Sequence, residues 1–125
     1  YQNEIGRLDV AVAPLRDIPI NRARSATSWL EHGYHGTAMV VSDLEPYAVV
    51  EHGVTGFKAR TPEDFAHYLR LLVEDAALRR RIGTAAQSEV VRAHTTEALG
   101  PTWREFIAAA GGATLGLDGD ERRRA

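Results

Sequence analysis

The feature that most constrains the fold is the alternation of short apolar runs with longer helix-like segments in the first half of the chain. Residues 8–15 (LDVAVAPL) and residues 37–42 (TAMVVS) are short apolar runs, and the first is closed by Pro14. Such runs are typical of strands that are buried in an α/β sheet. The helix-like segment between them predicts a right-handed crossover, and therefore two parallel strands.

The middle of the chain predicts a third strand and a short helix. Residues 45–51 carry Pro46 at the first position of the expected helix, where a missing N–H is tolerated. The two glycines of HGVTGF indicate a turn that leads into a strand over residues 57–60. The segment 16–21, which contains Pro19, is expected to be a polar loop.

Three helices are predicted after the last strand. Thr61, Pro62 and the following acids have the order of a helix start, with a hydroxyl cap and negative charge in the first turn. Asp75 is expected to cap the next helix, and Gly100-Pro101 to begin the last one. The apolar positions expected on one side of each helix are Phe65, Leu69, Leu72 and Val73; Leu78, Ile82, Ala86 and Val90; and Trp103, Phe106, Ile107 and Ala110.

These elements predict an α/β fold: a partial Rossmann-like parallel sheet with flanking helices. We expect one domain over residues 1–110 and a disordered tail over residues 111–125, because that stretch has little apolar surface to bury. The chain begins with Tyr1 and its one methionine is Met39, so we interpret it as part of a longer protein. Three strands are few for a doubly wound domain, which favours the same interpretation.

Composition excludes several classes of function. Fifteen Lys and Arg face seventeen Asp and Glu, for a net charge of −2, which argues against a nucleic-acid binder. The chain has no cysteine, so it has neither a disulfide framework nor a thiolate metal site. No apolar run approaches the roughly 20 residues of a membrane span.

Residues 21–33 (NRARSATSWLEHG) place cations where a helix start disfavours them. Asn21 or Ser25 is expected to cap this helix, which should end at Gly36. Arg24 lies just before the helical pattern, and Glu31 follows on about the second turn. An anion bound between the cations and the free N–H groups of the helix would make the arrangement favourable.

Several segments in order resemble the C-terminal part of GT-B glycosyltransferases of the family 4, or group 1, type. They are DVAVAPL, NRARSATSWLEHGYHGTAMVVSD, PYAVVEHGVTGFKA, EDFAHYLRLLVEDAALRRRIGTAAQ and WREF. The resemblance runs from Leu8 to Phe106. It departs from the family pattern at Ala23, where many members carry a second Glu, at Ser28, often a Lys, and at Ala38, often a Pro.

The resemblance implies that Arg24, Ser25 and Asn21 bind the diphosphate of a nucleotide-sugar donor and that Glu31 binds its ribose. The whole enzyme would transfer a sugar, with retention, to a saccharide, lipid or protein acceptor bound by an N-terminal domain that this chain lacks. It would act in the cytoplasm, peripherally at the inner membrane face, without a cofactor or metal ion. The present piece alone is expected to be inactive.

Other interpretations remain open. Glu31 also fits an ordinary exposed helix residue, Ser25 a cap alone, and Asn21 a loop or cap residue. His32, His35 and His52 do not complete a metal site, because no fourth ligand is evident. Tyr47, Trp103 and Phe106 are interpreted as core or domain-packing residues.

The chain as a whole also fits a non-catalytic truncated remnant or a small α/β interaction module. A response-regulator-like domain is a third reading, but Asp9 alone does not make the acidic pocket that it requires.

Overall fold

A computed structural model describes residues 2–111, and it confirms the α/β class. Three parallel strands form one sheet in the order β1-β2-β3, with β1 at Val10–Ala13, β2 at Ala38–Ser42 and β3 at Phe57–Ala59. The predicted tail lies outside the described residues except for Gly111, which ends the last helix. Within the described part, no helix is both long and apolar enough to cross a membrane.

The register places the most buried strand in the centre of the sheet. Val10 lies opposite Ala38 on the β1 side, and Val40 lies opposite Phe57 on the β3 side. All five residues of β2 are buried, because helices cover both faces of the sheet there. This agrees with the continuous apolar run from which the strand was predicted.

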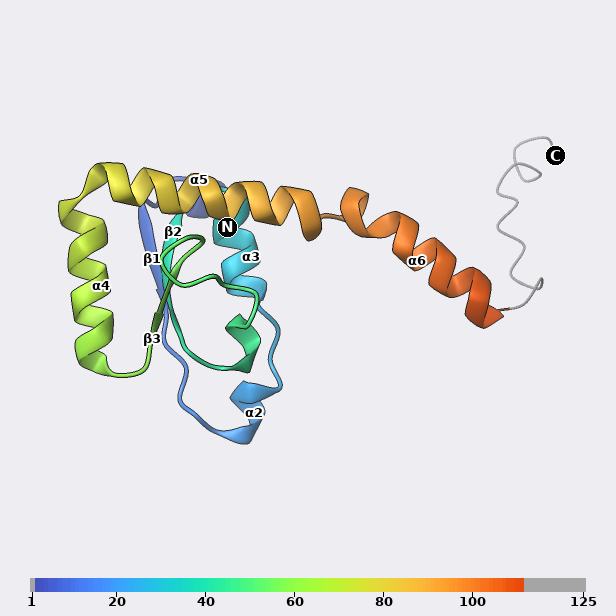
Figure 1. Ribbon diagram of the computed structural model, residues 1–125, viewed down its shortest axis with the longest axis horizontal. Coiled ribbons are helices and arrows are strands. Elements are labelled where there is room, and N and C mark those ends of the chain that lie inside the picture. The colour runs from blue at the N-terminus through green and yellow to red at the C-terminus, as the bar shows by residue number, and fades with distance from the viewer. Residues whose placement is uncertain (1, 112–125) are drawn as a thin grey trace.

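Two apolar cores lie on the two faces of the sheet, and helices flank both faces (Figure 1). One core joins the sheet to α3 (Thr27–Tyr34) and the other joins it to α4 (Pro62–Glu74). The helix α5 (Ala76–Ala93) lies across the sheet near the start of β2 and contributes to both cores. Residues of the first core include Trp29, Met39, Val41, Ala86 and Val90, and those of the second include Val40, Phe57, Leu72 and Ile82.

The helix starts after β3 confirm the predicted caps. Thr61 accepts a hydrogen bond from the Asp64 backbone N–H at 3.1 Å, and Asp64 accepts in return from the Thr61 backbone N–H at 3.1 Å. This capping box begins α4. Asp75 begins α5 by accepting from the Leu78 backbone N–H at 2.9 Å.

Several predicted boundaries are wrong. The segment 16–21 is not all loop, because Pro19 starts the short helix α2 (Pro19–Arg22). The helix expected over residues 45–51 is a single 3-10 turn, η1 (Glu45–Tyr47). The last helix, α6, runs Thr96–Gly111 and so contains Pro101, because Thr95 already supplies a cap to the Ala98 N–H. A short helix α1 (Gln2–Ile5) was not predicted.

One prediction of burial fails, and for two aromatic residues only the alternative of packing against another domain is left. Val73, placed in the buried stripe of α4, is 63% exposed. Trp103 and Phe106, at 58% and 62% exposed, are not core residues of the described chain, because α6 extends away from the sheet (Figure 1). Tyr47 is buried, as interpreted from the sequence.

The two edges of the sheet differ. On the outer side of β3, the Lys58 N–H donates to His52 Nδ1 at 3.0 Å and the Arg60 N–H donates to Asp64 Oδ2 at 2.9 Å. These side chains occupy donors that another strand would need. Among the described residues, β1 pairs with β2 alone, so its outer side carries no strand.

Gly83 is required where α5 meets the turn between α3 and β2. A Cβ atom added at Gly83 would lie 2.9 Å from the Gly36 carbonyl carbon and nearer still to its oxygen. Gly36 has φ +75°, a left-handed conformation that favours glycine. The Gly36 backbone therefore cannot easily shift away from α5. We expect Gly83→Ala to lower the free energy of unfolding by about 2–3 kcal/mol through overpacking, as measured by urea denaturation.

The matched control for this variant is Thr84→Ala at the exposed neighbouring position of the same helix. Its unfolding free energy should stay within about 0.5 kcal/mol of that of the parent. Equal stability of Gly83→Ala and Thr84→Ala would contradict the close contact between α5 and Gly36.

The capping box predicts a dependence of stability on acid pH. Hydrogen bonds from the Arg60 and Thr61 backbone N–H groups lower the pKa of Asp64 from its usual 3.8. The stabilisation is therefore present above the unfolded-state pKa and is lost as the pH falls through the lower, folded-state value. We expect the stability difference between the parent and Asp64→Asn to shrink below about pH 4.

Chemical denaturation at a series of pH values measures this difference, with Glu63→Gln, a carboxylate in the same turn outside the capping box, as the control. A difference that is constant between neutral and acid pH would show that the charge of Asp64 does not stabilise α4.

Candidate functional site

The candidate site lies in the connection between β1 and α3, at the end of the sheet where the strands finish (Figure 1). The chain is held as it leaves β1: the Leu15 backbone N–H donates to Ser42 Oγ at 2.7 Å, and this hydroxyl donates to the Leu15 carbonyl at 3.2 Å. Ser42 is buried and ends β2. Ligands of open α/β sheets bind at this end of the strands.

Arg22 holds the loop in shape. Its Nε and Nη2 donate to the two carboxylate oxygens of Asp17 at 2.5 and 2.7 Å, and its Nη1 donates to Glu45 Oε1 at 2.6 Å. The Arg22 hydrogen bond is the main cause of a lowered pKa of Asp17. Because its guanidinium N–H groups donate to both Asp17 and Glu45, Arg22 links α2 to the loop and to η1.

Asn21 and Ser25 do not cap α3, so this prediction is wrong. Asn21 lies within α2 and its amide Nδ2 donates to the Arg16 carbonyl at 2.9 Å, because Pro19 starts a helix before the expected one. Ser25 Oγ lies 2.6 Å from Thr27 Oγ1. The N-cap is Ala26, which has no side chain able to accept a hydrogen bond.

The start of α3 therefore keeps backbone donors that no side chain satisfies. The first N–H to donate within the helix is that of Leu30, to the Ala26 carbonyl at 3.0 Å. The free N–H groups before it, together with the helix dipole, favour an anion. The hydroxyl groups of Ser25 and Thr27 are exposed at the same place.

Arg24 places a cation close to this helix start. Its side chain is exposed, and within residues 2–111 its guanidinium makes no hydrogen bond or ion pair. The positive charge of Arg24 acts on Tyr47: burial raises the pKa of the Tyr47 hydroxyl, and Arg24 partly opposes that rise. The exposed guanidinium therefore lies close enough to Tyr47 for its charge to act on that hydroxyl.

Glu31 lies one turn further along α3 and is half-buried. It lines a cavity of about 350 Å³ between α3 and the junction of α5 with α6. The other lining residues are Leu30, Tyr34, Val90, His94, Thr95, Thr96 and Glu97. No residue of the segment 21–25 lines this cavity, so the structure does not place Glu31 and Arg24 in one pocket.

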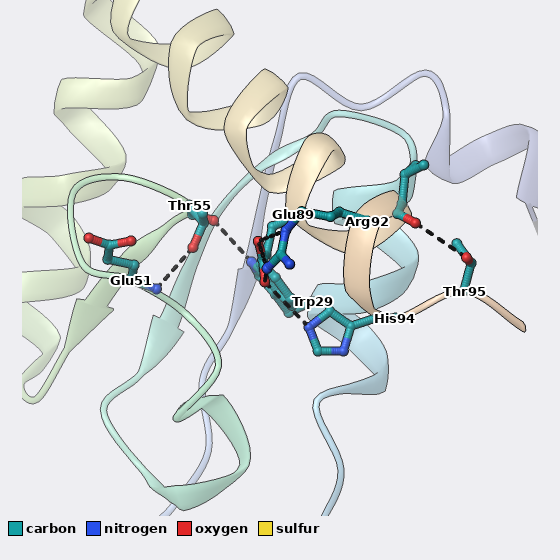
Figure 2. A network of polar contacts seen from close by, with 8 residues as sticks. Trp29, Glu51, Thr55, Glu89, Arg92, His94 and Thr95 are labelled. Atoms are coloured by element: carbon teal, nitrogen blue, oxygen red, sulfur yellow. Dashed lines mark hydrogen bonds and ion pairs between the residues drawn. The ribbon is translucent and has the colours of Figure 1, made fainter. Parts of the chain in front are cut away.

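Around the candidate site lie residues that the sequence analysis did not identify. Figure 2 shows the fully buried Trp29, whose indole Nε1 donates to the Thr55 carbonyl at 3.0 Å. Thr55 Oγ1 accepts from the Glu51 backbone N–H at 2.9 Å. These bonds fix the 51–56 turn against α3. An indole on the apolar side of the helical pattern was the available signal, because a buried Trp usually finds an acceptor.

His94 marks the junction beside Glu31. Its Nε2 lies 4.0 Å from Glu89 Oε1, and its ring meets Trp29 edge-on with centroids 6.1 Å apart (Figure 2). Arg92 also pairs with Glu89, at 2.8 Å. The end of α5 thus joins a charged cluster to the packing of α3.

The histidines considered as metal ligands have other contacts. His32 Nδ1 lies 2.8 Å from the Ser28 carbonyl, and His52 Nδ1 accepts from the Lys58 N–H. His35 meets the Tyr34 ring edge-on. Across residues 2–111 no group of three His, Cys, Asp or Glu side chains is arranged to hold a metal ion.

No model of a known protein family matches the chain, and no curated protein matches it either.

The placement of Arg24 near Tyr47 can be measured through the Tyr47 pKa. Because the charge of Arg24 lowers the Tyr47 pKa, Arg24→Ala should raise that pKa further. Titration of the chain with ¹³C-labelled tyrosine, followed by NMR, separates Tyr47 from the other tyrosines. The control Arg80→Ala, exposed on α5, should leave the Tyr47 pKa unchanged, and an equal effect of both variants would refute the placement.

Proposed function

We propose that the chain is the donor-binding part of a GT-B glycosyltransferase and that the start of α3 binds the diphosphate of a nucleotide sugar. The observation that carries the proposal is an uncapped helix start beside an exposed arginine without a partner in the described chain. The ordered resemblance of residues 8–106 to family 4 glycosyltransferases supports the same assignment.

Each residue has a role that its chemistry suits. Arg24 would donate two parallel hydrogen bonds to phosphate oxygens, and Ser25 would add a hydroxyl donor. Asn21 would act by positioning the loop, since its amide already donates to Arg16. The nucleotide would extend from the helix start to the separate cavity that Glu31 lines, and there Glu31 would accept hydrogen bonds from the two ribose hydroxyls.

In the complete enzyme these groups would lower the barrier to sugar transfer. Negative charge grows on the leaving diphosphate as its bond to the sugar breaks. Fixed N–H groups and Arg24 would stabilise that charge without reorganisation, which is the usual source of a large catalytic effect. The acceptor, a saccharide, lipid or protein, would bind to a further domain, in the cytoplasm at the inner membrane face, and no metal ion or cofactor is invoked.

A non-catalytic interaction module is the second candidate. The observation in its favour is the exposed apolar side of α6, with Trp103 and Phe106. Nucleotide binding distinguishes the two, because an interaction module has no reason to recognise a diphosphate.

Titration of the ¹⁵N-labelled chain with UDP, GDP and ADP tests the donor site. We expect chemical-shift changes at residues 24–31 and about tenfold weaker binding by Arg24→Ala, because a charged hydrogen bond is lost. Arg80→Ala should bind as the parent does. Absence of shifts at residues 24–31 with every nucleotide would reject the proposal.

A second arm tests the ribose contact. Glu31→Gln should weaken binding of UDP but not of 2′,3′-dideoxyuridine diphosphate, which lacks the hydroxyls. Equal weakening for both ligands would assign Glu31 to the structure of α3 instead.

A further inference from the structure

A second polar cavity lies along the outer edge of β3, apart from the connection between β1 and α3. It has a volume of about 360 Å³ and is formed by the end of β2, the 51–56 turn, β3 and the first turns of α4. Its lining residues are Asp43, His52, Lys58, Arg60, Asp64 and Tyr68. The volume is in the range of roughly 300–1,000 Å³ that is usual for small-molecule sites.

Lys58 is unusual in this chain. It is the only lysine in the sequence, against fourteen arginines. Its side chain is half-buried at the cavity and makes no ion pair or hydrogen bond within residues 2–111. An ammonium group in such a position presents three donors that water or a bound ligand can satisfy.

The other lining groups are held in place by their neighbours. Arg60 Nε pairs with Asp43 Oδ2 at 2.7 Å, and Asp64 accepts the backbone N–H groups that begin α4. His52 Nδ1 accepts the Lys58 N–H, so the neutral ring carries its hydrogen on Nε2. The ring of Tyr68 stacks on Phe57 with centroids 4.7 Å apart, and His52 meets both rings edge-on.

Hydrogen-bond donors and acceptors therefore alternate around the cavity, and the charges of its lining side chains sum to zero. Lys58 and Arg60 balance Asp43 and Asp64, and His52 and Tyr68 each add a polar N–H or O–H group. A small anion that paired with Lys58 would also face two carboxylates. A neutral ligand that both donates and accepts hydrogen bonds satisfies the lining without such repulsion.

We propose that this edge cavity binds a neutral polyhydroxylated small molecule, of the size of one sugar ring. Its hydroxyl groups would accept from Lys58 and His52 and donate to the outward carboxylate oxygens. The site is independent of the proposed diphosphate site, since none of the residues 21–31 line it.

The single lysine gives a direct probe of the site. Reductive methylation with ¹³C-formaldehyde keeps the charge and labels Lys58 and the amino terminus alone. Glucose, mannose, N-acetylglucosamine and myo-inositol are titrated separately, with acetate and inorganic phosphate as anionic probes. We expect at least one of the neutral probes to shift the Lys58 signal, together with the backbone signals of residues 52–60.

Variants separate binding from structure. Lys58→Met keeps the aliphatic stem and should weaken binding of the neutral probe about tenfold, as judged by backbone shifts. Tyr68→Phe keeps the stacked ring and should also weaken it, whereas Tyr34→Phe, an exposed tyrosine on α3, should not. Arg24→Ala should leave sugar binding unchanged, and Lys58→Met should leave nucleotide binding unchanged.

Two results would overturn the proposal. One is the absence of shifts with all four neutral probes, and the other is a response to acetate or phosphate alone, which would make the cavity an anion site. Because Arg24 and Lys58 are tested against both ligand classes, failure here is distinct from failure of the diphosphate site.

Discussion

The close contact between α5 and the Gly36 turn determines how the rest of the molecule is assembled. Gly83 lets the axis of α5 approach the backbone between α3 and β2, and Gln87 Nε2 donates to the Tyr34 carbonyl at 2.9 Å. The same helix sends Ala86 and Val90 into one core and Ile82 into the other. The C-terminal end of α3 is therefore fixed, and its N-terminal end is directed to the finishing ends of the strands.

Much of the fold follows from local sequence patterns. The run TAMVVS predicted the central strand correctly, because a strand covered on both faces does not need alternating apolar and polar residues. Thr61 and Asp75 predicted the starts of α4 and α5 correctly, because their side chains accept hydrogen bonds from backbone N–H groups three residues further along the chain. The prediction of a buried Val73 failed, because helical spacing does not show whether a distant segment covers that position, and Val73 is exposed in the described chain.

The sequence predicts where a candidate anion site lies, but it does not predict how the loop around it is arranged. The residues of the 21–31 segment indicated an anion near a helix start, and the structure leaves that start uncapped at Ala26. The sequence could not show that Arg22 would form ion pairs with Asp17 and Glu45, because these pairs depend on how the loop folds. It also could not show that Glu31 faces a cavity shared with α6, because this depends on the junction at His94.

The unequal edges of the sheet limit how copies of this chain can associate. Backbone donors along β3 are already occupied by His52 and Asp64, whereas β1 has no neighbour on its outer side in the described chain. If two copies join through β1, both remaining edges of the enlarged sheet are blocked β3 strands. Association by strand pairing then stops at a closed pair, and an open fibre, which needs two free edges on each copy, cannot grow.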